Sequence, residues 1–442
     1  MTEERAQSSV DGDESQPNIV LVTADSVRAD HCGFLNPEMN TTPTLDGLAE
    51  EGLVFESAIA PGPRTPSSVP VIWTGEHVGL ENRDVYTSRG EKKRNWQERR
   101  QRIRRHLDRF DTIAERMQRY GYDTGAVTAN PWTSTDTGFD QGFDRFVEVD
   151  RLPDDGSTSL GKRLVSKASV LPRVPDADRW LLTWTDFYDE VRAVRDTLSE
   201  PYFLWVFLLD AHQPYITPPE FRAETTGPGM LYANAWYNYR FTPFEELPDN
   251  LERRFRGAYR DTVRSVDGFV EQLLGDLSAD DPAFVFHSDH GEAMKEHGTR
   301  GHRPELYDEN LRVPLLVHGV EDSGRVPEQS CLRLLPRFLE GIARGSTNTD
   351  TLKEDSIVVE TEERERVALR TNEWKRIDSS EEWNFAWKTP TDELYNLASD
   401  PLETTNLFES NRNVSKLCDL LTDRHDQWLN ERRRISDSSR GW

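Results

Sequence analysis

Four runs of apolar residues, rich in β-branched and aromatic types, recur along the first two thirds of the chain. They cover residues 18–25, 123–130, 202–212 and 283–290. The runs lack the regular polar alternation of a half-exposed strand, so each predicts a strand buried on both faces. Stretches with helical periodicity precede two of these runs, at 112–122 and 263–277. This alternation predicts an α/β fold with a large doubly wound, mixed but mainly parallel sheet flanked by helices.

The pattern changes after about residue 340. The segments SIVVET, RVALRTNEWKRI and FAWKTPTDELYNL predict short antiparallel strands, and residues 414–434 predict a final helix. We therefore expect a disordered tail over residues 1–16, a main domain over 17–340 and a small C-terminal antiparallel α+β subdomain over 341–442.

Ionisable residues follow three of the four predicted strands. Asp25 ends the first strand, Asp210 and His212 end the third, and Asp289 and His290 end the fourth. Ligands of such sheets bind beyond the carboxyl ends of the strands. A single strand-end aspartate often only caps a helix, but two carboxylates and an imidazole together suit a divalent ion. The pattern predicts a metal site formed by Asp25, Asp289 and His290.

Residues 61–77 begin as a loop and then enter a helix. Thr65 followed by Pro66 is a typical pair of N-cap and first-turn residues. A hydroxyl at this position faces the positive end of the helix, where an anionic ester would also bind. Taken alone, the segment is better explained as a plain helix cap. Pro70 is expected to shorten or bend the helix.

Two segments have the character of insertions. Residues 80–110 are dense in arginine, and two interpretations stand: a helical lid that recruits an anionic substrate, or a solvated helix paired with the chain's own carboxylates. The second is the favoured interpretation. Residues 151–200 are irregular and then helical, with aromatic residues at a spacing typical of a core.

The charge of the chain is strongly negative. Of 442 residues, 79 are acidic and 54 basic, which gives a formal net charge of −25, and only nine of the basic residues are lysines. An acidic surface poor in lysine is typical of halophilic proteins, with an ordinary acidic protein as the alternative. The negative field disfavours nucleic acid and anionic membranes as partners.

Cysteine usage and the first residues bear on the compartment. Cys32, Cys331 and Cys418 lie far apart and form no metal-binding pattern, so we expect free, buried thiols. The N-terminus lacks the basic and apolar regions of a signal peptide, which favours a cytoplasmic protein. The most apolar stretch, at 203–212, is too short to span a bilayer, so no transmembrane segment is expected.

A series of motifs, in order along the chain, resembles the sulfatase family of the alkaline phosphatase superfamily. The resemblance covers residues 17–320 and 367–408, and it implies that the main domain is a sulfatase-like catalytic domain. The segments that carry it are PNIVLVTADSVRADHCG, TPTLDGLAEEGLVFESAIAPGPRTPSS, WVFLLDAHQPY, FVFHSDHGEAMKEHGTRGHRPELYDENLRVPLLVHG and DELYNLASDPLETTNL.

By position, the resemblance implies that one divalent metal ion is bound by Asp25, Thr65, Asp289 and His290. Ca²⁺ is the ion implied by the family, with Mn²⁺ and Zn²⁺ as alternatives. Thr65 would be the catalytic residue.

The resemblance also implies roles for three histidines and an arginine. His212 and His302 would bind the ester oxygens, His297 would act as an acid or proton relay, and Arg28 would support the first strand. A second metal ion held by Asp210, His212 and His302 is the less favoured alternative. Two-metal relatives space the aspartate and histidine more widely on that strand than this chain does.

The chain departs from the family pattern at three positions. The family's nucleophile is a formylglycine made from Cys or Ser in a C/S-x-P-S-R motif, whereas this chain has Thr65-Pro66-Ser67-Ser68-Val69. Ser26 stands where the family has a second Asp, and Asn130 is the nearest polar substitute for a family lysine. A threonine has no second hydroxyl through which sulfate could be eliminated, so water would have to attack sulfur or phosphorus directly.

Three functions follow from these observations. The first is a metal-dependent hydrolase of small-molecule or glycan sulfate or phosphate esters, with Thr65 as nucleophile. The second is a phosphotransferase or phosphodiesterase that uses the same residues. The third, of another class, is a non-catalytic protein that binds anionic glycans or esters. The presence of the implied metal ligands and of His212, His297 and His302 favours an enzyme over a non-catalytic binding protein.

Overall fold

The computed structural model describes most of the chain in segments. These are residues 16–78, 91–149, 181–240, 248–301, 303–362, 366–379, 392–420 and 423. The predicted tail over 1–16, apart from its last residue, and the predicted final helix beyond residue 420, apart from residue 423, lie outside the described residues. So do most of the 151–200 segment and His302.

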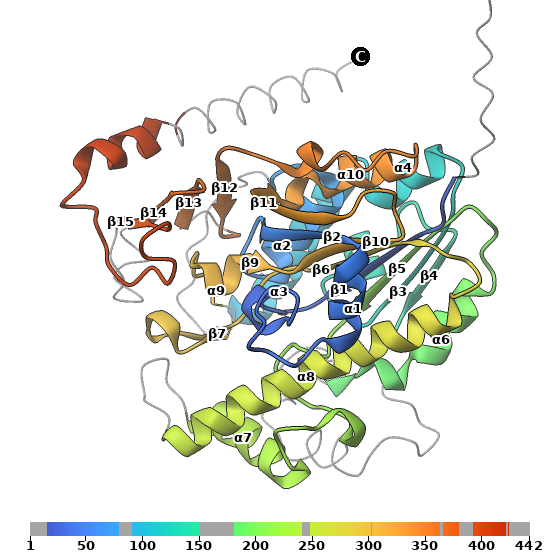
Figure 1. Cartoon of the computed structure of the whole chain (residues 1–442), viewed down its shortest axis with the longest axis horizontal. Helices are drawn as coiled ribbons and strands as arrows, with labels where there is room; N and C mark the ends of the chain where they lie inside the picture. Colours follow the sequence, from blue (N-terminus) through green and yellow to red (C-terminus); the bar gives the residue numbers. More distant parts are fainter. Residues whose placement is uncertain are drawn as a thin grey trace, which may run out of the picture.

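A nine-stranded sheet forms the centre of the described fold (Figure 1). The four predicted strands are confirmed as β1 (Ile19–Ala24), β3 (Asp123–Thr128), β5 (Tyr202–Leu208) and β6 (Ala283–Ser288). Every residue of β1, β5 and β6 is buried, which explains why these runs are apolar throughout. β1 pairs in parallel with both β5 and β6, so the ends of these three strands lie side by side.

The sheet is mixed because one inner strand runs the opposite way. The order is β11-β2-β10-β6-β1-β5-β3-β4, with β9 paired to β2. β10 is antiparallel to both β6 and β2, whereas the other neighbours along this order are parallel. The further strands are β2 (Leu53–Ile59), β4 (Arg145–Glu148), β9 (Arg312–Val313), β10 (Leu315–His318) and β11 (Gly324–Cys331). The predicted mixed, mainly parallel α/β fold is confirmed.

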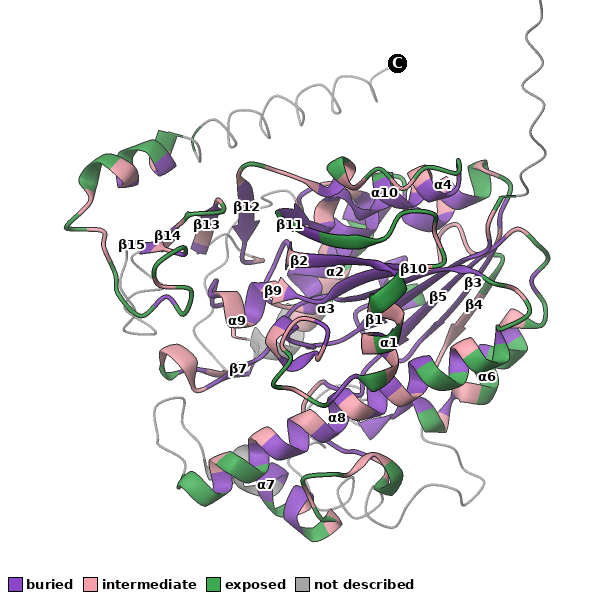
Figure 2. Cartoon of the chain, viewed as in Figure 1, coloured by how far each residue is buried: buried purple, intermediate pink, exposed green. Residues whose placement is uncertain are grey.

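Helices cover both faces of the sheet, as the doubly wound prediction requires. One face carries α1 (Pro43–Glu51), α6 (Tyr188–Arg195) and α8 (Asp249–Asp276), and the other carries α2 (Thr65–Thr74), α4 (Ile113–Arg119) and α10 (Leu335–Ile342). The helices on each face form an apolar cluster with the sheet residues that they cover. Figure 2 shows the buried strands between helices whose outer residues are exposed. None of the described helices is both long enough and apolar enough to cross a membrane.

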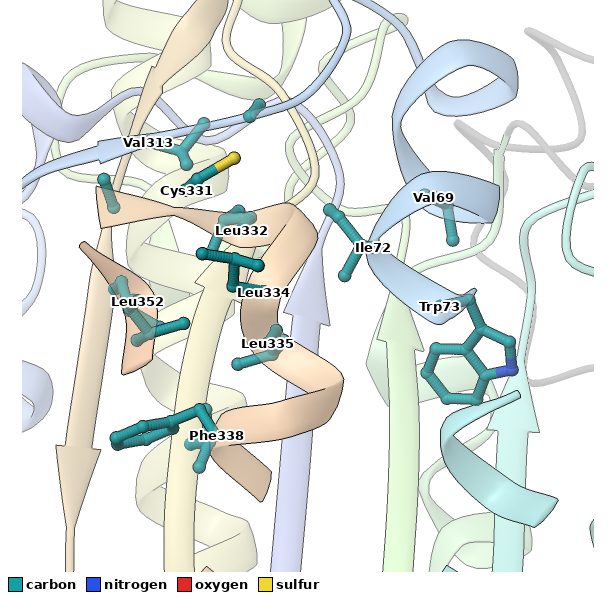
Figure 3. Close-up of a cluster of buried hydrophobic side chains, with 14 of the residues drawn as sticks. Val69, Ile72, Trp73, Val313, Cys331, Leu332, Leu334, Leu335, Phe338 and Leu352 are labelled. Atoms are coloured by element: carbon teal, nitrogen blue, oxygen red, sulfur yellow. The ribbon is translucent and has the colours of Figure 1, made fainter. Parts of the chain in front are cut away.

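An apolar cluster holds α2 in place (Figure 3). Ile72 of α2 points towards Leu332 and Leu334, which precede α10, and Trp73 lies further along the same helix. The Trp73 ring lies 4.2 Å from the Trp205 ring of β5, measured between centroids. The packing holds the C-terminal part of α2 against the sheet.

The arginine-rich segment forms α3 (Glu91–Leu107), which is docked rather than free. Ile103 and Leu107 are buried in the same apolar cluster as α2. Arg100 pairs with Asp136 at 3.1 Å, and other arginines of the helix also reach carboxylates of the chain. These contacts support the interpretation of a helix paired with the chain's own carboxylates.

A separate four-stranded antiparallel sheet follows the main sheet. Its strands lie in sequence order: β12 (Ile357–Glu360), β13 (Arg366–Arg370), β14 (Trp374–Ser379) and β15 (Asp392–Asn396). This confirms the predicted antiparallel C-terminal strands. Buried charges join the sheet to residues 296–309: Arg366 contacts Glu305 and Glu393, and Lys375 contacts Asp308 at 2.5 Å. Residues 412–420 are helical.

The remaining described elements are one further helix, α7, and a set of short helices and strands. They are η1 (Ala29–His31), η2 (Thr135–Thr137), η5 (Trp184–Asp186), η6 (Pro219–Phe221), α7 (Gly227–Arg240), β7 (Ala293–Met294), η7 (Glu296–Gly298), β8 (Arg300–Gly301), α9 (Asp308–Leu311), η8 (Leu332–Leu334) and η9 (Thr349–Leu352). Cys32, Cys331 and Cys418 are buried free thiols, as predicted.

Candidate metal and ester site

The ends of β1 and β6 bring the predicted metal ligands together. Ala24 and Ser288 are register partners, so Asp25 and Asp289 leave the sheet side by side. One ligand atom from each of Asp25, Asp289 and His290 lies within 4.8 Å of the other two. All three side chains are fully buried.

Thr65 joins this cluster from α2. Its hydroxyl lies 3.4 Å from Asp25 Oδ2 and 3.3 Å from His290 Nε2. Arg64 rather than Thr65 is the N-cap, and Thr65 is the first helical residue, so the predicted cap position was one residue too late. Pro70 does not end the helix, which continues to Thr74. Gly75 closes it with a φ of +81° that favours glycine.

The cluster has the chemistry of a cation site. His290 Nδ1 donates to the carbonyl of Gly291 at 2.8 Å, and His290 Nε2 lies 3.5 Å from both Asp25 Oδ1 and Asp289 Oδ2. Asp289 Oδ2 accepts no hydrogen bond from the described residues. Burial and the neighbouring charge of Asp289 raise the pKa of Asp25 well above its ordinary value, and burial raises the pKa of Asp289 to about 7. A bound cation would stabilise both ionised carboxylates.

Ser26 and Asn130 orient the carboxylate of Asp25. Ser26 Oγ donates to Asp25 Oδ1 at 2.7 Å, and Asn130 Nδ2 donates to Asp25 Oδ2 at 2.7 Å. Ser26 has a φ of +64°, and its amide donates to Asp289 Oδ1 at 3.3 Å. Ser26 and Asn130 therefore each give the Asp25 carboxylate one neutral hydrogen-bond donor.

Arg28 ties the end of β1 to the segment after β6. Its guanidinium donates to both carboxylate oxygens of Asp30, to the carbonyl of Glu292 at 3.0 Å and to Glu296 Oε1 at 3.1 Å. The side chain is 7% exposed. This arrangement agrees with the predicted supporting role.

The two ionisable residues that follow β5, Asp210 and His212, make different contacts. Asp210 accepts hydrogen bonds from the Trp184 amide at Oδ2 and from the Ser265 hydroxyl at Oδ1, each at 3.0 Å. His212 is half-buried, and its Nδ1 donates to the carbonyl of Gln213 at 2.5 Å. Within the described residues, Asp25, Asp289 and His290 form the single cluster with metal-ligand spacing, and it excludes Asp210.

His297 is fully engaged with neighbouring groups. Its Nδ1 donates to Glu309 Oε1 at 2.8 Å, and its Nε2 donates to the carbonyl of Glu403 at 2.9 Å. The ring stacks on Tyr307 with centroids 3.6 Å apart. Burial lowers the pKa of His297, but the hydrogen bond and charge of Glu309 outweigh it and raise the pKa to about 9. Both ring nitrogens of His297 are therefore hydrogen-bonded to other groups of the chain.

Glu292 is a buried acid that we did not predict from the sequence. Its Oε1 accepts a hydrogen bond from Gln213 Nε2 at 2.7 Å, which links the segments after β5 and β6. Burial raises its pKa to about 8, against the opposing charge of His290. Its place two residues after His290 in the SDHGE segment was the available signal. Gly291 permits the turn, because a Cβ there would overlap the carbonyl of Glu309.

The chain is similar in sequence to known sulfatases. The chain is 25% identical to mouse (Mus musculus) iduronate 2-sulfatase over 68% of its length, and 23% identical to an ulvan-active sulfatase of Formosa agariphila over 69%. The matches cover 59% and 56% of those two proteins, so the chain spans less than two thirds of either.

Solved structures share the fold. A phosphonate monoester hydrolase of Agrobacterium radiobacter has a TM-score of 0.64 and 17% identity, over 94% of this chain and 96% of that one. A 2-O GAG sulfatase has a TM-score of 0.66 and 16% identity, over 95% and 94% of the two chains. The family model for Sulfatase matches residues 17–330, which include the whole candidate metal cluster. This chain therefore belongs to the sulfatase family.

Proposed function

We propose that this chain is a metal-dependent hydrolase of sulfate esters in which Thr65 is the nucleophile. The observation that carries the proposal is the position of the Thr65 hydroxyl, within 3.4 Å of both Asp25 and His290 at the edge of the metal cluster. The names of the relatives, iduronate 2-sulfatase and ulvan-active sulfatase, favour sulfated saccharides as the substrate class.

The proposed metal ligands are Asp25, Thr65, Asp289 and His290. When bound, a divalent ion would supply positive charge for the Thr65 oxygen and for the anionic ester. Ca²⁺ is the ion we propose from the family resemblance. The imidazole of His290 also keeps Mn²⁺ and Zn²⁺ as candidates.

The chain's own residues would carry the bond changes. Thr65 Oγ1 gives up its proton and attacks the sulfur of the ester. The bond between sulfur and the ester oxygen breaks, and this oxygen takes up a proton and leaves as an alcohol. Water then attacks sulfur, the bond between sulfur and Thr65 Oγ1 breaks, and one proton of the water returns to Thr65 as sulfate is released. His212, beyond the end of β5, would bind the ester oxygens together with His302, which lies outside the described residues. The proton relay predicted for His297 stays a prediction, tested below.

Thr65 also favours a second candidate, hydrolysis or transfer of a phosphate or phosphonate ester. A threonine cannot eliminate sulfate through a second hydroxyl, so both anions would be released by attack of water or of an acceptor. Assays with an aryl sulfate, an aryl phosphate and a bis-aryl phosphate separate these candidates. A higher kcat/KM for the aryl sulfate supports the first candidate, and a higher value for either phosphate supports the second.

The metal and Thr65 are tested on purified protein. Removal of bound metal with a chelator should abolish turnover, and adding the ion back should restore it. Thr65→Val keeps the shape of the side chain without the hydroxyl and should lower kcat by about a hundredfold or more. Thr65→Ser keeps the hydroxyl and should retain measurable turnover. Full activity of a metal-free sample, or of Thr65→Val, would refute the mechanism. Absence of turnover by the wild type with all three substrates would leave a binding protein as the remaining function.

A further inference from the structure

Glu292 is a fully buried carboxylate next to the metal cluster, and its backbone is fixed at both ends. Its amide donates to the carbonyl of Glu309 at 2.9 Å, and its own carbonyl accepts from Arg28 Nη1 at 3.0 Å. The residue is 0% exposed. Burying a carboxylate is costly unless polar groups or a cation stabilise its charge. The surroundings of the side chain therefore indicate what it does.

Neutral groups that follow β5 orient the Glu292 side chain. Gln213 Nε2 donates to Glu292 Oε1 at 2.7 Å and to the Tyr215 hydroxyl at 3.3 Å. Tyr215 is fully buried, and its hydroxyl is a further hydrogen-bond partner of Glu292. Amide and hydroxyl donors stabilise a carboxylate but leave its negative charge in place.

Ser26 links Glu292 to the metal cluster. The Ser26 hydroxyl donates to Asp25 Oδ1 at 2.7 Å, and it is also a hydrogen-bond partner of the Glu292 side chain. Burial is the largest cause of the raised pKa of Asp25, and the negative charges of Asp289 and Glu292 add to it. The charge of Glu292 therefore acts on a proposed metal ligand, and a divalent ion bound there would stabilise the ionised form of Glu292 as well.

The place of Glu292 corresponds to a carboxylate that the chain lacks. Ser26 stands where the sulfatase family has a second aspartate, so this chain has one carboxylate fewer directly after β1. Glu292 extends from the segment after β6, the parallel neighbour of β1, and reaches the same residue. The negative charge that is missing after one strand is thus present after the neighbouring strand.

We propose that Glu292 is a positioning residue of the metal site, whose carboxylate supplies beside Ser26 the negative charge that an aspartate at position 26 would have supplied. It acts through its charge and through Ser26 rather than as a ligand, because the group with ligand spacing among the described residues is Asp25, Asp289 and His290. The inference rests on the proposed function, since it concerns the same metal ion.

Metal affinity tests the inference without turnover. Full-length wild type and Glu292→Gln are freed of metal with a chelator, and Ca²⁺, Mn²⁺ and Zn²⁺ are titrated separately by calorimetry at one pH and ionic strength. Glu292→Gln keeps the size of the side chain and removes its charge. The dissociation constant of the ion that the wild type binds most tightly should rise about 10- to 100-fold. An unchanged constant would overturn the proposal.

Moving the charge to position 26 separates this role from a purely structural one. The double variant Ser26→Asp, Glu292→Gln restores the number of carboxylates, and aspartate tolerates the φ of +64° at this position better than most residues do. It should bind the ion within about fivefold of the wild type, and weaker binding would overturn the proposal. The double variant also keeps the test decisive if Glu292→Gln alone does not fold.

Glu296→Gln is the matched control for a lost carboxylate. Glu296 lies in the same segment and pairs with Arg28 at 3.1 Å and with Arg256 at 3.4 Å. Because arginines already balance its charge, the variant should change the dissociation constant by no more than about twofold. A rise as large as that of Glu292→Gln would show a general effect of negative charge and would overturn the assignment to Glu292.

Binding and turnover together separate this inference from the proposed function. A wild type that binds none of the three ions would overturn both. If the affinities follow the expected pattern but the wild type hydrolyses no ester, the proposed function fails and the role of Glu292 in metal binding stands. If the wild type binds an ion and hydrolyses an aryl sulfate while Glu292→Gln binds that ion equally well, the hydrolase stands and only the inference fails.

Discussion

His297 should stabilise the fold in a pH-dependent way, and a substitution measures that contribution. The protonated ring bridges Glu309 of the main domain and the backbone of Glu403, and it stacks on Tyr307. His297→Gln removes the charge while keeping an amide of similar reach. We expect the variant to be less stable than the wild type at neutral pH and below.

The magnitude follows from the pKa of His297. A pKa that rises from 6.5 to about 9 on folding corresponds to about 3 kcal/mol of stability. Because the folded pKa is raised, this contribution is complete below about pH 6.5 and is lost as the pH rises through about 9. The ring is 14% exposed, so solvent screening makes about 2 kcal/mol a more realistic figure.

The assay is urea unfolding of both proteins at pH 6, 7.5 and 10. The difference in unfolding free energy should be largest at pH 6 and nearly absent at pH 10. Glu309, Glu403, Asp400 and Tyr307 face or adjoin the ring, and all four remain in both proteins. A difference that is constant with pH, or that grows towards pH 10, would refute this reasoning.

The same variant decides between a structural and a catalytic role. A double-mutant cycle with Glu309→Gln should give a coupling that disappears at high pH, because the pair is then uncharged on the histidine side. If folded His297→Gln loses about a hundredfold in kcat while its stability is unchanged, the proton relay predicted from the sequence is correct instead.

Four further predictions follow from other contacts. Asn130→Ala removes the 2.7 Å hydrogen bond to Asp25 and should lower kcat/KM by about tenfold in a steady-state assay; an unchanged value would contradict the orienting role. Ser26→Asp adds a carboxylate to the cluster and should shift metal competition, read by elemental analysis, towards Ca²⁺; an unchanged preference would argue against Ser26 as a selectivity residue. Trp205→Ala should cost about 3–5 kcal/mol in urea unfolding, because the buried ring packs against Trp73, and a loss below about 1 kcal/mol would contradict this packing. If the acidic surface is halophilic, the unfolding temperature should rise between about 0.1 and 1 M KCl as charge repulsion is screened, and a fall would exclude that interpretation.

The main strands were predictable because parallel strands that are buried on both faces consist almost entirely of apolar residues. Every residue of β1, β5 and β6 is buried, and the apolar runs follow from that burial. Their order in the sheet was not predictable, since long crossovers join strands that are neighbours in space. The sequence also could not predict that β10 is antiparallel to its neighbours, because a short apolar run has the same composition in either direction.

The candidate site was predictable only in part. Asp25 and Asp289 each follow a buried parallel strand, so the sequence was sufficient to predict that both lie at one edge of the sheet. The structure adds that the two strands are direct neighbours. Asp210 also follows a buried strand, yet it bonds to Trp184 and Ser265, which are 26 and 55 positions away. Likewise, the partner of His297 Nε2 lies 106 positions away on Glu403. Contacts at such separations leave no local pattern in the residues that make them.

The proposed nucleophile and the proposed metal ligands belong to different elements of the fold. Asp25 and Asp289 extend from the central strands, whereas Thr65 begins a helix that Ile72 and Trp73 fasten at its far end. An exchange of Thr65 for another small hydroxyl- or thiol-bearing residue would therefore disturb neither the strands nor the anchorage of the helix. In such a fold, evolution can exchange the residue at position 65 while the surrounding strands and helices stay the same.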